Sequence, residues 1–383
     1  MDARIADRSQ PDIELRPLLI RRVDVIPVAL PLNKPVAMAF ETVAHARNIL
    51  VRIEAADGTV GWGEAASAPT MTGDTLDGLV AAVRDHLAPL LVGKDARLRP
   101  ALRRAMQAAL LSNTGAHSAV EMALLDLAGR AAGRPLIELI GGPLRRAVAP
   151  MWLLGNSTPE ADIAEAQAKE REGFWFFKLK VGTKPIEREI AATHALRAAM
   201  GAKIPLCADA NCGLELADAR RYVTGTEAAG LMFLEQPFPP DALDDLAALA
   251  KISPTPLGAD EAIHSLADIE TQARCGARGV SLKLIKLGGL TNALAAAVHC
   301  RKLNLSVNVA AKIAESSIAS AAAVHLACAV PDVSWGVSLT HFYLAEDVVR
   351  RPLPLGNGTV ALPAEPGLGV EVDEAAVARL RIR

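Results

Sequence analysis

The most restrictive feature of this sequence is a regular alternation, after Pro143, of short apolar runs with alanine-rich stretches that favour helix. Eight such runs recur at intervals of roughly 25 to 30 residues, which is the strand count of a (β/α)₈ barrel. A doubly wound sheet is the alternative, but it rarely needs eight evenly spaced units, and no G-x-G-x-x-G string follows a strand here. The runs are 148–153, 175–181, 205–210, 231–235, 255–259, 279–284, 306–309 and 333–337.

The part of the chain that precedes the barrel follows a different pattern. The segment 48–54 alternates apolar and polar residues and ends at the turn signal Asp57-Gly58. A matching run at 59–64 follows, so we expect a β-hairpin. Strands followed by helices predict an α+β domain. The other expected elements are a strand at 23–28 and helices at 76–91, 101–111 and 117–132.

Composition excludes several functional classes. The 383 residues include 41 Lys and Arg against 43 Asp and Glu, a net charge of −2, and only 3% aromatic residues. A nucleic-acid binder would normally carry a basic surplus and stacking aromatics, and a protein of anionic membranes a basic patch, so we expect neither partner. No secretory signal or membrane span is evident, and five scattered cysteines without a C-x-x-C pair suit a reducing compartment. We therefore expect a cytoplasmic protein that acts on a small molecule.

Three acidic residues, Asp209, Glu235 and Asp260, end three successive predicted strands. Because neighbouring strand ends lie about 5 Å apart, their carboxylates should converge at the C-terminal mouth of the barrel. Like charges cannot share a spot without a cation, and an all-oxygen donor set points to a hard divalent ion, Mg²⁺ by default. The competing interpretation is that each acid merely caps the helix that follows it.

Lysines supply the complementary groups. Lys178 and Lys180 are two apart on one predicted strand, so their side chains share a face, and each ammonium group should lower the pKa of the other. That would make a lysine usable as a base near neutral pH. Lys283 ends a strand beyond the acidic ones, so a base could stand on either side of one substrate. Lys286 lies in the turn after that strand and fits an ordinary surface lysine.

Together these strings resemble the enolase superfamily, and within it the subgroup similar to muconate lactonizing enzyme. The family's K-x-K is matched by 178–180, its Asp, Glu and Asp metal ligands by the three acids, and its later lysine by Lys283 ahead of Gly288-Gly289. The Glu-Ser-Ser-Ile string at 315–318 looks like the family's late Glu-Ser motif, and 119–142 is similar to its capping-domain string. The resemblance covers most of the chain.

The resemblance implies a modified (β/α)₇β barrel, of the TIM-barrel kind, with an N-terminal α+β capping domain. On that basis we expect a disordered arm at 1–19, the capping domain at 20–145 and the barrel with its metal and lysines at 146–350. The C-terminal segment, 351–383, is expected to return to the capping domain.

The implied chemistry is abstraction of the α-proton of a small-molecule carboxylate substrate, through an enolate stabilised by Mg²⁺, with Mn²⁺ as a substitute. The resemblance makes Lys180 the base on one face, Lys283 the acid or second base on the other, and Lys178 a residue that tunes Lys180. Relatives assemble as dimers or octamers, so a homo-oligomer is expected. The expected metal ligands are Asp209, Glu235 and Asp260, and the expected supporting or substrate-binding residues are Asn211, Glu261, Glu315, His341 and Arg47.

Departures from the relatives bear on the substrate. Dipeptide epimerases usually carry Asp-x-Asp after the eighth strand, where this chain has the uncharged string Ser338-Leu339-Thr340. Muconate cycloisomerases have a Glu-Leu-Phe-Gly-Pro-like stretch at that place, whereas here His341 follows. His341 either reads a second polar group of the substrate or is solvated in its loop. Arg47 either pairs with a distal carboxylate or faces solvent.

Several reactions remain open at this point. Cycloisomerisation needs one lysine, racemisation or epimerisation needs both, and a dehydratase of a hydroxy acid would use the same scaffold. Other classes are a barrel that binds a phosphorylated sugar through Gly288-Gly289, a metal-independent Schiff-base lyase that uses Lys180 or Lys283, and a non-catalytic relative that only binds a ligand.

Overall fold

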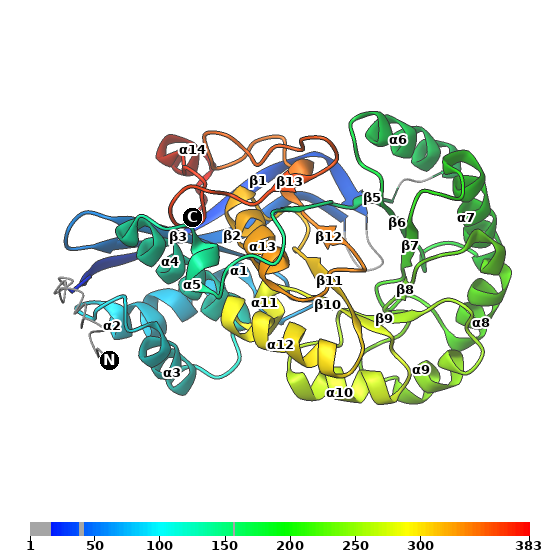
Figure 1. The fold of residues 1–383 in the computed structure, drawn as a ribbon, viewed down its shortest axis with the longest axis horizontal. Helices are drawn as coiled ribbons and strands as arrows, with labels where there is room; N and C mark the ends of the chain where they lie inside the picture. The colour runs from blue at the N-terminus through cyan, green and yellow to red at the C-terminus, as the bar shows by residue number, and fades with distance from the viewer. Residues whose placement is uncertain (1–16, 38–41, 156–157) are drawn as a thin grey trace, which may run out of the picture.

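The computed structural model describes residues 17–37, 42–155 and 158–383, which form an α+β domain beside a larger barrel (Figure 1). The expected fold class is thereby confirmed. Of the arm expected at 1–19, residues 1–16 lie outside the described part of the chain. Leu18 is already buried, and its backbone N–H donates to Asp95 Oδ1 at 3.1 Å, so the packed structure begins before the expected boundary at residue 20.

An antiparallel sheet forms the base of the capping domain. Its strands are β1 (Ile20–Ala37), β2 (Thr42–Ala55) and β3 (Val60–Ala66), in that spatial order. The turn at Asp57 and Gly58 joins β2 to β3, as the sequence predicts, and Gly58 has a φ of 89° that suits glycine. The sheet is thus built from the predicted hairpin with β1 added along β2.

Helix α4 (Thr114–Ala132) is buried along most of its length and packs directly on β3. A Cβ on Gly61 would lie 2.3 Å from the carbonyl oxygen of Ala123. A Cβ on Gly63 would lie 2.0 Å from that of Ala119, so this close approach of helix and sheet requires both glycines. The other helices of the domain are α1 (Leu76–Ala81), the π-helical turn η1 (Ala82–Leu87), α2 (Ala88–Leu91), α3 (Arg99–Ala109) and α5 (Leu136–Leu139).

Eight parallel strands of the described chain form the barrel, and neighbours in sequence are neighbours in space. A bridge between Pro150 and Val337 links the two ends of this sheet, which excludes the open, doubly wound alternative. The strands are β5 (Trp152–Leu154), β6 (Phe177–Lys180), β7 (Leu206–Asp209), β8 (Leu234–Glu235), β9 (Leu257–Ala259), β10 (Gly279–Leu282), β11 (Ser306–Ala310) and β12 (Val337–Ser338).

Helices between these strands cover the outside of the barrel, and the green ones among them form the arc on the right of Figure 1. They give the barrel strands a second apolar face to bury, as a parallel sheet requires. Short 3₁₀ turns, η2 (Glu227–Ala229) and η3 (His341–Tyr343), complete two of the connections. The helices are α6 (Pro159–Arg171), α7 (Ile186–Met200), α8 (Leu216–Gly225), α9 (Leu243–Ala250), α10 (Leu266–Arg274), α11 (Leu284–Leu287), α12 (Leu290–Lys302) and α13 (Ser317–Ala329).

The first and last predicted barrel strands are wrong in their bounds. The run predicted at 148–153 is split, because β4 (Ala147–Val148) pairs antiparallel with β13 (Val360–Ala361) and only β5 joins the barrel. Most of the run predicted at 333–337 is a turn that directs Trp335 into the barrel floor, the end of the barrel opposite the C-terminal mouth. There its ring stacks on that of Phe233, with the two ring centroids 4.2 Å apart. In both cases the apolar side chains are needed for packing and not for pairing within the barrel sheet. An apolar pattern in the sequence cannot distinguish these two roles.

The C-terminal segment lies against the capping domain. Helix α14 (Glu374–Leu380) is beside β1 in Figure 1. The backbone N–H of Ile382 donates to the carbonyl of Pro27 at 3.0 Å, and Leu136 donates to Gly367 at 2.7 Å. These backbone contacts tie the end of the chain to the first domain.

Two buried carboxylates of the capping domain hold the N-termini of two barrel helices. Glu64 on β3 accepts backbone N–H groups of Ser316 and Ala319, at 2.9 and 3.1 Å, at the start of α13. Glu121 on α4 accepts the N–H of Thr291, at 3.3 Å, at the start of α12. A helix N-terminus attracts negative charge, so these contacts fix the capping domain on the barrel.

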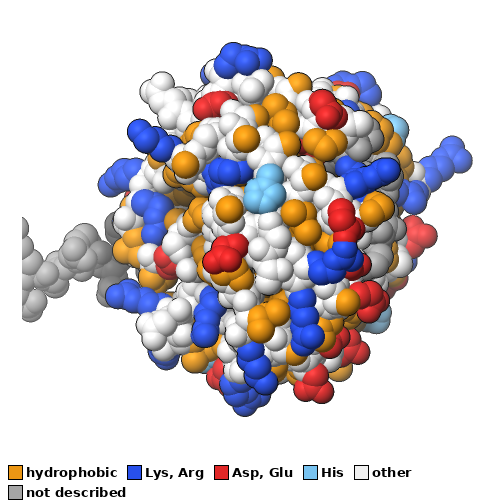
Figure 2. Space-filling model, turned by 90° about the vertical axis from the view of Figure 1, so that its right-hand side faces the viewer, with side chains coloured by type: hydrophobic (Ala, Val, Ile, Leu, Met, Phe, Trp, Pro, Cys, Tyr) orange, Lys and Arg blue, Asp and Glu red, His pale blue; other side chains and the backbone are white. Residues whose placement is uncertain are grey.

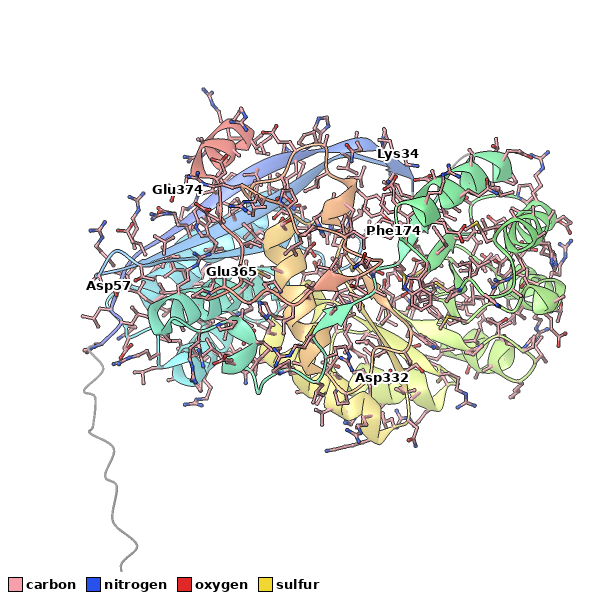
Figure 3. The ribbon with its side chains drawn as sticks, turned by 45° about the horizontal axis from the view of Figure 1, so that its top comes forward. Lys34, Asp57, Phe174, Asp332, Glu365 and Glu374 are labelled. Atoms are coloured by element: carbon pink, nitrogen blue, oxygen red, sulfur yellow. The ribbon has the colours of Figure 1, made fainter. Side chains whose placement is uncertain are left out.

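A third contact joins the end of the capping sheet that lies nearest the barrel to an outer helix of the barrel. Figure 3 shows Lys34 at the barrel end of β1 and Asp57 at the opposite end of the sheet. Lys34 forms an ion pair with Glu165 of α6. The sheet therefore extends from the turn at Asp57 to helix α6 on the outside of the barrel.

Replacing Glu64 with Ala should lower the free energy of unfolding by at least about 3 kcal/mol, because four buried donors lose this acceptor. These donors are the backbone N–H groups of Ser316 and Ala319, the hydroxyl of Ser316, and the side-chain amide of Asn48, which lies 2.7 Å from Glu64. Urea unfolding measures the change. The exposed Glu365 gives the control variant, Glu365→Ala, which should stay within about 0.5 kcal/mol of wild type. Equal losses in both variants would contradict the docking role.

Basic and acidic side chains are interspersed over the face of the molecule that Figure 2 shows. This mixture agrees with the near-zero net charge of the chain. In the part of the chain that the structure describes, no helix combines the length and apolar character needed to cross a membrane. The five cysteines all lie in that part and are free thiols.

Candidate active site

The three predicted carboxylates lie together at the C-terminal mouth of the barrel. Asp209 and Glu235 are the last residues of β7 and β8 and face each other in register, and Asp260 directly follows β9. All three side chains are buried, with residue exposures of 3%, 1% and 2%. The parallel strands and their short lengths therefore bring three acids from distant parts of the sequence to one place.

Each of these carboxylates is paired with lysine. Lys180 Nζ lies 2.7 Å from Asp209 Oδ2, and Lys283 Nζ lies 2.5 Å from Asp260 Oδ2. Lys178 forms an ion pair with Glu235. The cluster is thus a buried network of alternating charge, in which each ion is offset by a partner in a site of low dielectric.

The expected effect of Lys178 and Lys180 on each other is wrong for Lys178. Burial disfavours its charge, but the carboxylates of Glu235 and Asp209 outweigh burial and raise the pKa of Lys178 above its usual value. For Glu235, burial raises the pKa to about 7 against the opposing charge of Lys178. The nearest charges around Lys178 are acids, so attraction dominates over the repulsion between lysines.

Lys286 is the clearest error of the sequence interpretation. It is fully buried rather than exposed, and its Nζ donates to Asp260 Oδ1 at 2.6 Å and to the carbonyl of Ser281 at 3.0 Å. The chain turns into α11 after β10, and this turn carries Lys286 back beneath Asp260. Burial and the neighbouring Lys283 lower its pKa, although Asp260 opposes the change. Asp260 is therefore held by two lysines, which keep its own pKa below the usual range despite burial.

Asn211 and Glu261 support this cluster from the loops that follow β7 and β9. Asn211 accepts a hydrogen bond from Lys180, and its amide donates to Glu261 Oε1 at 2.8 Å. Asn211 has a φ of 41°, a left-handed conformation that non-glycine residues adopt mainly where the surroundings hold them. Gln236, which the sequence interpretation missed as a site residue, is also left-handed, and its Oε1 accepts the N–H of Asp260 at 2.8 Å.

A cavity of about 210 Å³ opens above the cluster. Lys180 on β6 and Lys283 after β10 both line it, and their strands are four positions apart in the eight-stranded barrel of the described chain. In such a barrel, strands four apart stand on opposite sides of the mouth. The loop between β3 and α1 of the capping domain contributes Met71, whose Sδ lies 3.8 Å from Lys283 Nζ. The two lysines thus approach one small cavity from opposite sides.

The remaining predicted site residues lie outside the described lining of this cavity. Glu315 is buried, and one of its side-chain oxygens accepts the N–H of Lys312 at 3.1 Å. His341 is buried rather than solvated, its Nε2 is 2.9 Å from the carbonyl of Leu353, and burial lowers its pKa to about 4. The side chain of Arg47 on β2 is exposed.

Glu315→Gln should flatten the pH dependence of stability between pH 4.5 and 8. Burial, reinforced by Glu64, raises the pKa of Glu315 from 4.5 to about 8, against the opposing charges of Lys283 and Lys312. The native state therefore holds a proton that the unfolded chain releases, so its stabilising effect is full below pH 4.5 and lost as pH rises through 8. Glutamine can accept the same hydrogen bond without titrating, which removes a slope of up to about 1.4 kcal/mol per pH unit.

Urea unfolding at several pH values between those limits checks this expectation. The slope that remains in the variant comes from the other titrating groups, among them Glu64, whose pKa burial also raises and whose charge is coupled to that of Glu315. Identical slopes for wild type and Glu315→Gln would contradict the raised pKa of Glu315.

The donor chemistry of the cluster fits a hard divalent cation. Among the described residues, no three His, Cys, Asp or Glu side chains already surround a common point as a preformed metal site. The carboxylates of Asp209, Glu235 and Asp260 instead face ammonium groups, which are the positive charges of the cluster. Three buried carboxylates on adjacent strands supply only oxygen donors, the type that Mg²⁺ and Mn²⁺ prefer.

Family comparisons agree with this arrangement. Residues 161–376 match the family model described as Enolase C-terminal domain-like. Residues 20–141 match the Mandelate racemase / muconate lactonizing enzyme, N-terminal domain. The chain belongs to this family. The expected enzyme class, an isomerase or lyase of the enolase superfamily, is thereby confirmed.

Known members of the family are similar along almost the whole chain. The L-Ala-D/L-Glu epimerase of Bacillus subtilis (strain 168) is 31% identical over 354 residues, which are 92% of this chain and 96% of the epimerase. A chloromuconate cycloisomerase of Pseudomonas putida is 31% identical over 360 residues, 92% of this chain and 96% of that enzyme. The solved structure of muconate lactonizing enzyme from Pseudomonas fluorescens, complexed with muconolactone, has a TM-score of 0.92 and 30% identity, and the match covers 95% of this chain and 99% of that one.

The alternative of a phosphorylated sugar bound at Gly288-Gly289 does not fit the geometry. A Cβ on Gly289 would lie 1.9 Å from Glu121 Oε2, so a carboxylate of the capping domain already covers this turn. A phosphate would meet negative charge there instead of free backbone N–H groups.

Proposed function

We propose that this enzyme isomerises a small carboxylate substrate by moving its α-proton, with Lys180 and Lys283 acting from opposite faces. The observation that carries the proposal is that these two lysines line one cavity from strands on opposite sides of the barrel, above three buried carboxylates. A carbon acid between two such amines has a base on one side and an acid on the other.

Asp209, Glu235 and Asp260 would hold a divalent cation, Mg²⁺ or Mn²⁺, and through it the substrate carboxylate. When bound, the cation supplies positive charge that stabilises the enolate as it forms. Family membership and the donor set support this assignment.

The local contacts suggest how Lys180 becomes a base. Asp209 and Asn211 hold its Nζ at the edge of the cavity. Asp209 would also be one of the residues that hold the cation, so the amine of Lys180 would be able to turn from that carboxylate toward the substrate. Lys180 then removes the α-proton, and Lys283 delivers a proton to the opposite face or takes one in the reverse direction.

Two outcomes fit this geometry, cycloisomerisation and racemisation or epimerisation. The first needs one of the two lysines to act, and the second needs both. A dehydratase on the same scaffold is the alternative. The Schiff-base alternative is weaker, because the amines of Lys180 and Lys283 are engaged by Asp209 and Asp260.

The setting of the enzyme is also a proposal. Five free thiols support a reducing, cytoplasmic location. A homo-oligomer, either dimer or octamer, is proposed from the family resemblance.

Proton NMR in deuterium oxide tests the function. The purified protein is incubated with Mg²⁺ and a panel of N-acylamino acids, dipeptides, proline derivatives and muconates. We expect loss of the α-hydrogen signal, or a new lactone signal, for one of these classes, and we expect excess EDTA to stop the reaction. A reaction that continues at the same rate in EDTA would contradict the proposal.

A further inference from the structure

The loop that follows β6 is held by a carboxylate outside the cavity. Glu189, in the first turn of α7, is 3% exposed and lies outside the described lining of the cavity. Its Oε2 accepts the backbone N–H of Gly182 at 2.8 Å, and its Oε1 accepts those of Thr183 and Lys184, each at 2.9 Å. Three consecutive N–H groups of the loop 182–184 therefore converge on one side chain.

These three donors need an acceptor at both ends of the side-chain fork. An ionised carboxylate only accepts hydrogen bonds, whereas glutamine has one oxygen and an amide group that donates. A glutamine at position 189 would therefore turn its NH₂ group toward at least one backbone N–H, and that donor would lose its acceptor. The loop thus keeps all three hydrogen bonds only with a carboxylate at this position.

Glu189 is carried by a helix that is fixed on its neighbour. The hydroxyl of Thr193, one turn later in α7, donates to the carbonyl of Glu189 at 2.8 Å. Thr193 Oγ1 also lies 2.9 Å from the hydroxyl of Tyr222 on α8, and both side chains are buried. The carboxylate therefore projects from a rigid part of the barrel wall.

The loop 182–184 also touches the turn after β7, which carries Asn211. A Cβ on Gly182, whose φ is 86°, would lie 3.1 Å from the carbonyl oxygen of Ala210. A Cβ on Gly213 would lie 2.7 Å from the carbonyl oxygen of Gly182. The two loops meet backbone to backbone, so a displacement of one must be accommodated by the other.

This arrangement fixes Lys180 at two points. Its backbone precedes Gly182 by two residues, and its Nζ donates to Asn211 and lies 2.7 Å from Asp209 Oδ2. Without the hydrogen bonds to Glu189, the loop would be released at the first point. The contact at Gly182 would pass that release to the turn that carries Asn211, which is the second point.

We propose that Glu189 is a positioning residue, which holds the loop 182–184 so that the amine of Lys180 keeps its place at the edge of the cavity. This inference rests on the proposed function, because that function makes Lys180 the base. A displacement of about 1 Å at the reacting groups costs up to about 10²-fold in rate, even when the altered residue is distant. Substrate binding should change much less, because Glu189 lies outside the lining of the cavity.

Glu189→Gln tests this role in the full-length protein with Mg²⁺. Proton NMR in deuterium oxide gives kcat and KM for the substrate class that the panel identifies. We expect kcat to fall about 10- to 100-fold and KM to stay within about threefold of wild type.

Asp332→Asn is the matched control. Asp332 Oδ2 also accepts backbone N–H groups, those of Val307 at 2.9 Å and Ser334 at 3.2 Å. Val307 is near the start of β11, so this carboxylate acts at the opposite end of the barrel from the cavity. Its kcat should stay within about threefold of wild type, because no reacting group is displaced.

A double variant shows whether the effect passes through Lys180. In the Lys180→Met background, adding Glu189→Gln should change the residual rate less than about twofold, because no amine is left there to position. A general loss of structure would instead lower the rate by the same factor in both backgrounds.

Gly182→Ala disturbs the same loop from its other face and takes the place of Glu189→Gln if that variant does not fold. It should show the same fall in kcat with a nearly unchanged KM. Gly201→Ala is its control, because Gly201 follows α7 with a similar φ of 79°, and a Cβ there would meet nothing within 4 Å. The kcat of this control should stay near that of wild type.

The outcomes separate this inference from the proposed function. If wild type is active, a kcat of Glu189→Gln equal to that of Asp332→Asn, or an equal loss in the Lys180→Met background, would overturn only the positioning role. If wild type acts on no probe, the proposed function fails, and a crystal structure of Glu189→Gln decides the inference by itself. Separation of Lys180 Nζ from Asn211 would then support it, and an unmoved Lys180 would overturn it.

Discussion

Replacing Lys180 with Met should reduce turnover by about 10³- to 10⁴-fold, because the remaining amine on the β6 side of the cavity, that of Lys178, is ion-paired with Glu235. Solvent exchange of the substrate α-hydrogen, followed by proton NMR in deuterium oxide, measures the loss. Lys251→Met is the control for loss of a lysine as such, and its rate should stay near that of wild type. Activity within about tenfold of wild type in Lys180→Met would exclude Lys180 as the base.

The matching substitution at Lys283 separates the two isomerisation classes. In a two-base racemase, Lys283→Met should lose interconversion of the enantiomers but still exchange the α-hydrogen of the one that Lys180 attacks. In a one-base cycloisomerase that uses Lys180, the variant should keep much more of its rate. Loss of exchange for both enantiomers, with the protein still folded, would contradict independent roles for the two faces.

Removing Glu235 alone should destabilise the metal-free protein by about 3–5 kcal/mol, since it leaves the buried ammonium group of Lys178 without its nearest partner. Lys178 is 4% exposed, and the next carboxylate, Asp209, is 4.0 Å away. The double variant Lys178→Met with Glu235→Leu should recover most of this loss, because two apolar side chains replace two buried charges. Its turnover should nevertheless be abolished.

Urea unfolding in excess EDTA of wild type, both single variants and the double variant gives the coupling energy. The exposed pair Arg134 and Glu138, at 3.0 Å, provides a matched control cycle, for which less than about 1 kcal/mol is expected. Additive effects at Lys178 and Glu235 would show that the two charges do not compensate each other in the native state.

Most of the barrel could be predicted because buried parallel strands are short apolar runs with regular spacing. The run at 148–153 was misassigned because its first part is equally apolar but pairs with β13 near the end of the chain. Trp335 was placed in a strand because its role in the barrel floor depends on Phe233, about 100 residues away in sequence. Such pairings are set by tertiary contacts and leave no local signal.

The convergence of the three acids could be predicted because each lies at or directly after the end of a strand, and strand ends meet at one edge. Lys286 and Gln236 could not be recognised, since their roles depend on turns that direct them back toward Asp260. The pKa of Lys178 was predicted in the wrong direction because the sequence shows the neighbouring Lys180 but not the closer Glu235. Spacing along one strand therefore reveals which groups share a face but not which charges are nearest.

The most direct test of the cation site is an anomalous-scattering map of crystals soaked in Mn²⁺. The expected result is one strong peak within coordination distance of Asp209, Glu235 and Asp260, with the ammonium groups of Lys180 and Lys283 withdrawn from those carboxylates. The same peak should be absent from crystals of Asp209→Asn with Glu235→Gln. A wild-type map in which the three carboxylates keep their lysine partners and no peak lies among them would contradict the metal-dependent account of this site.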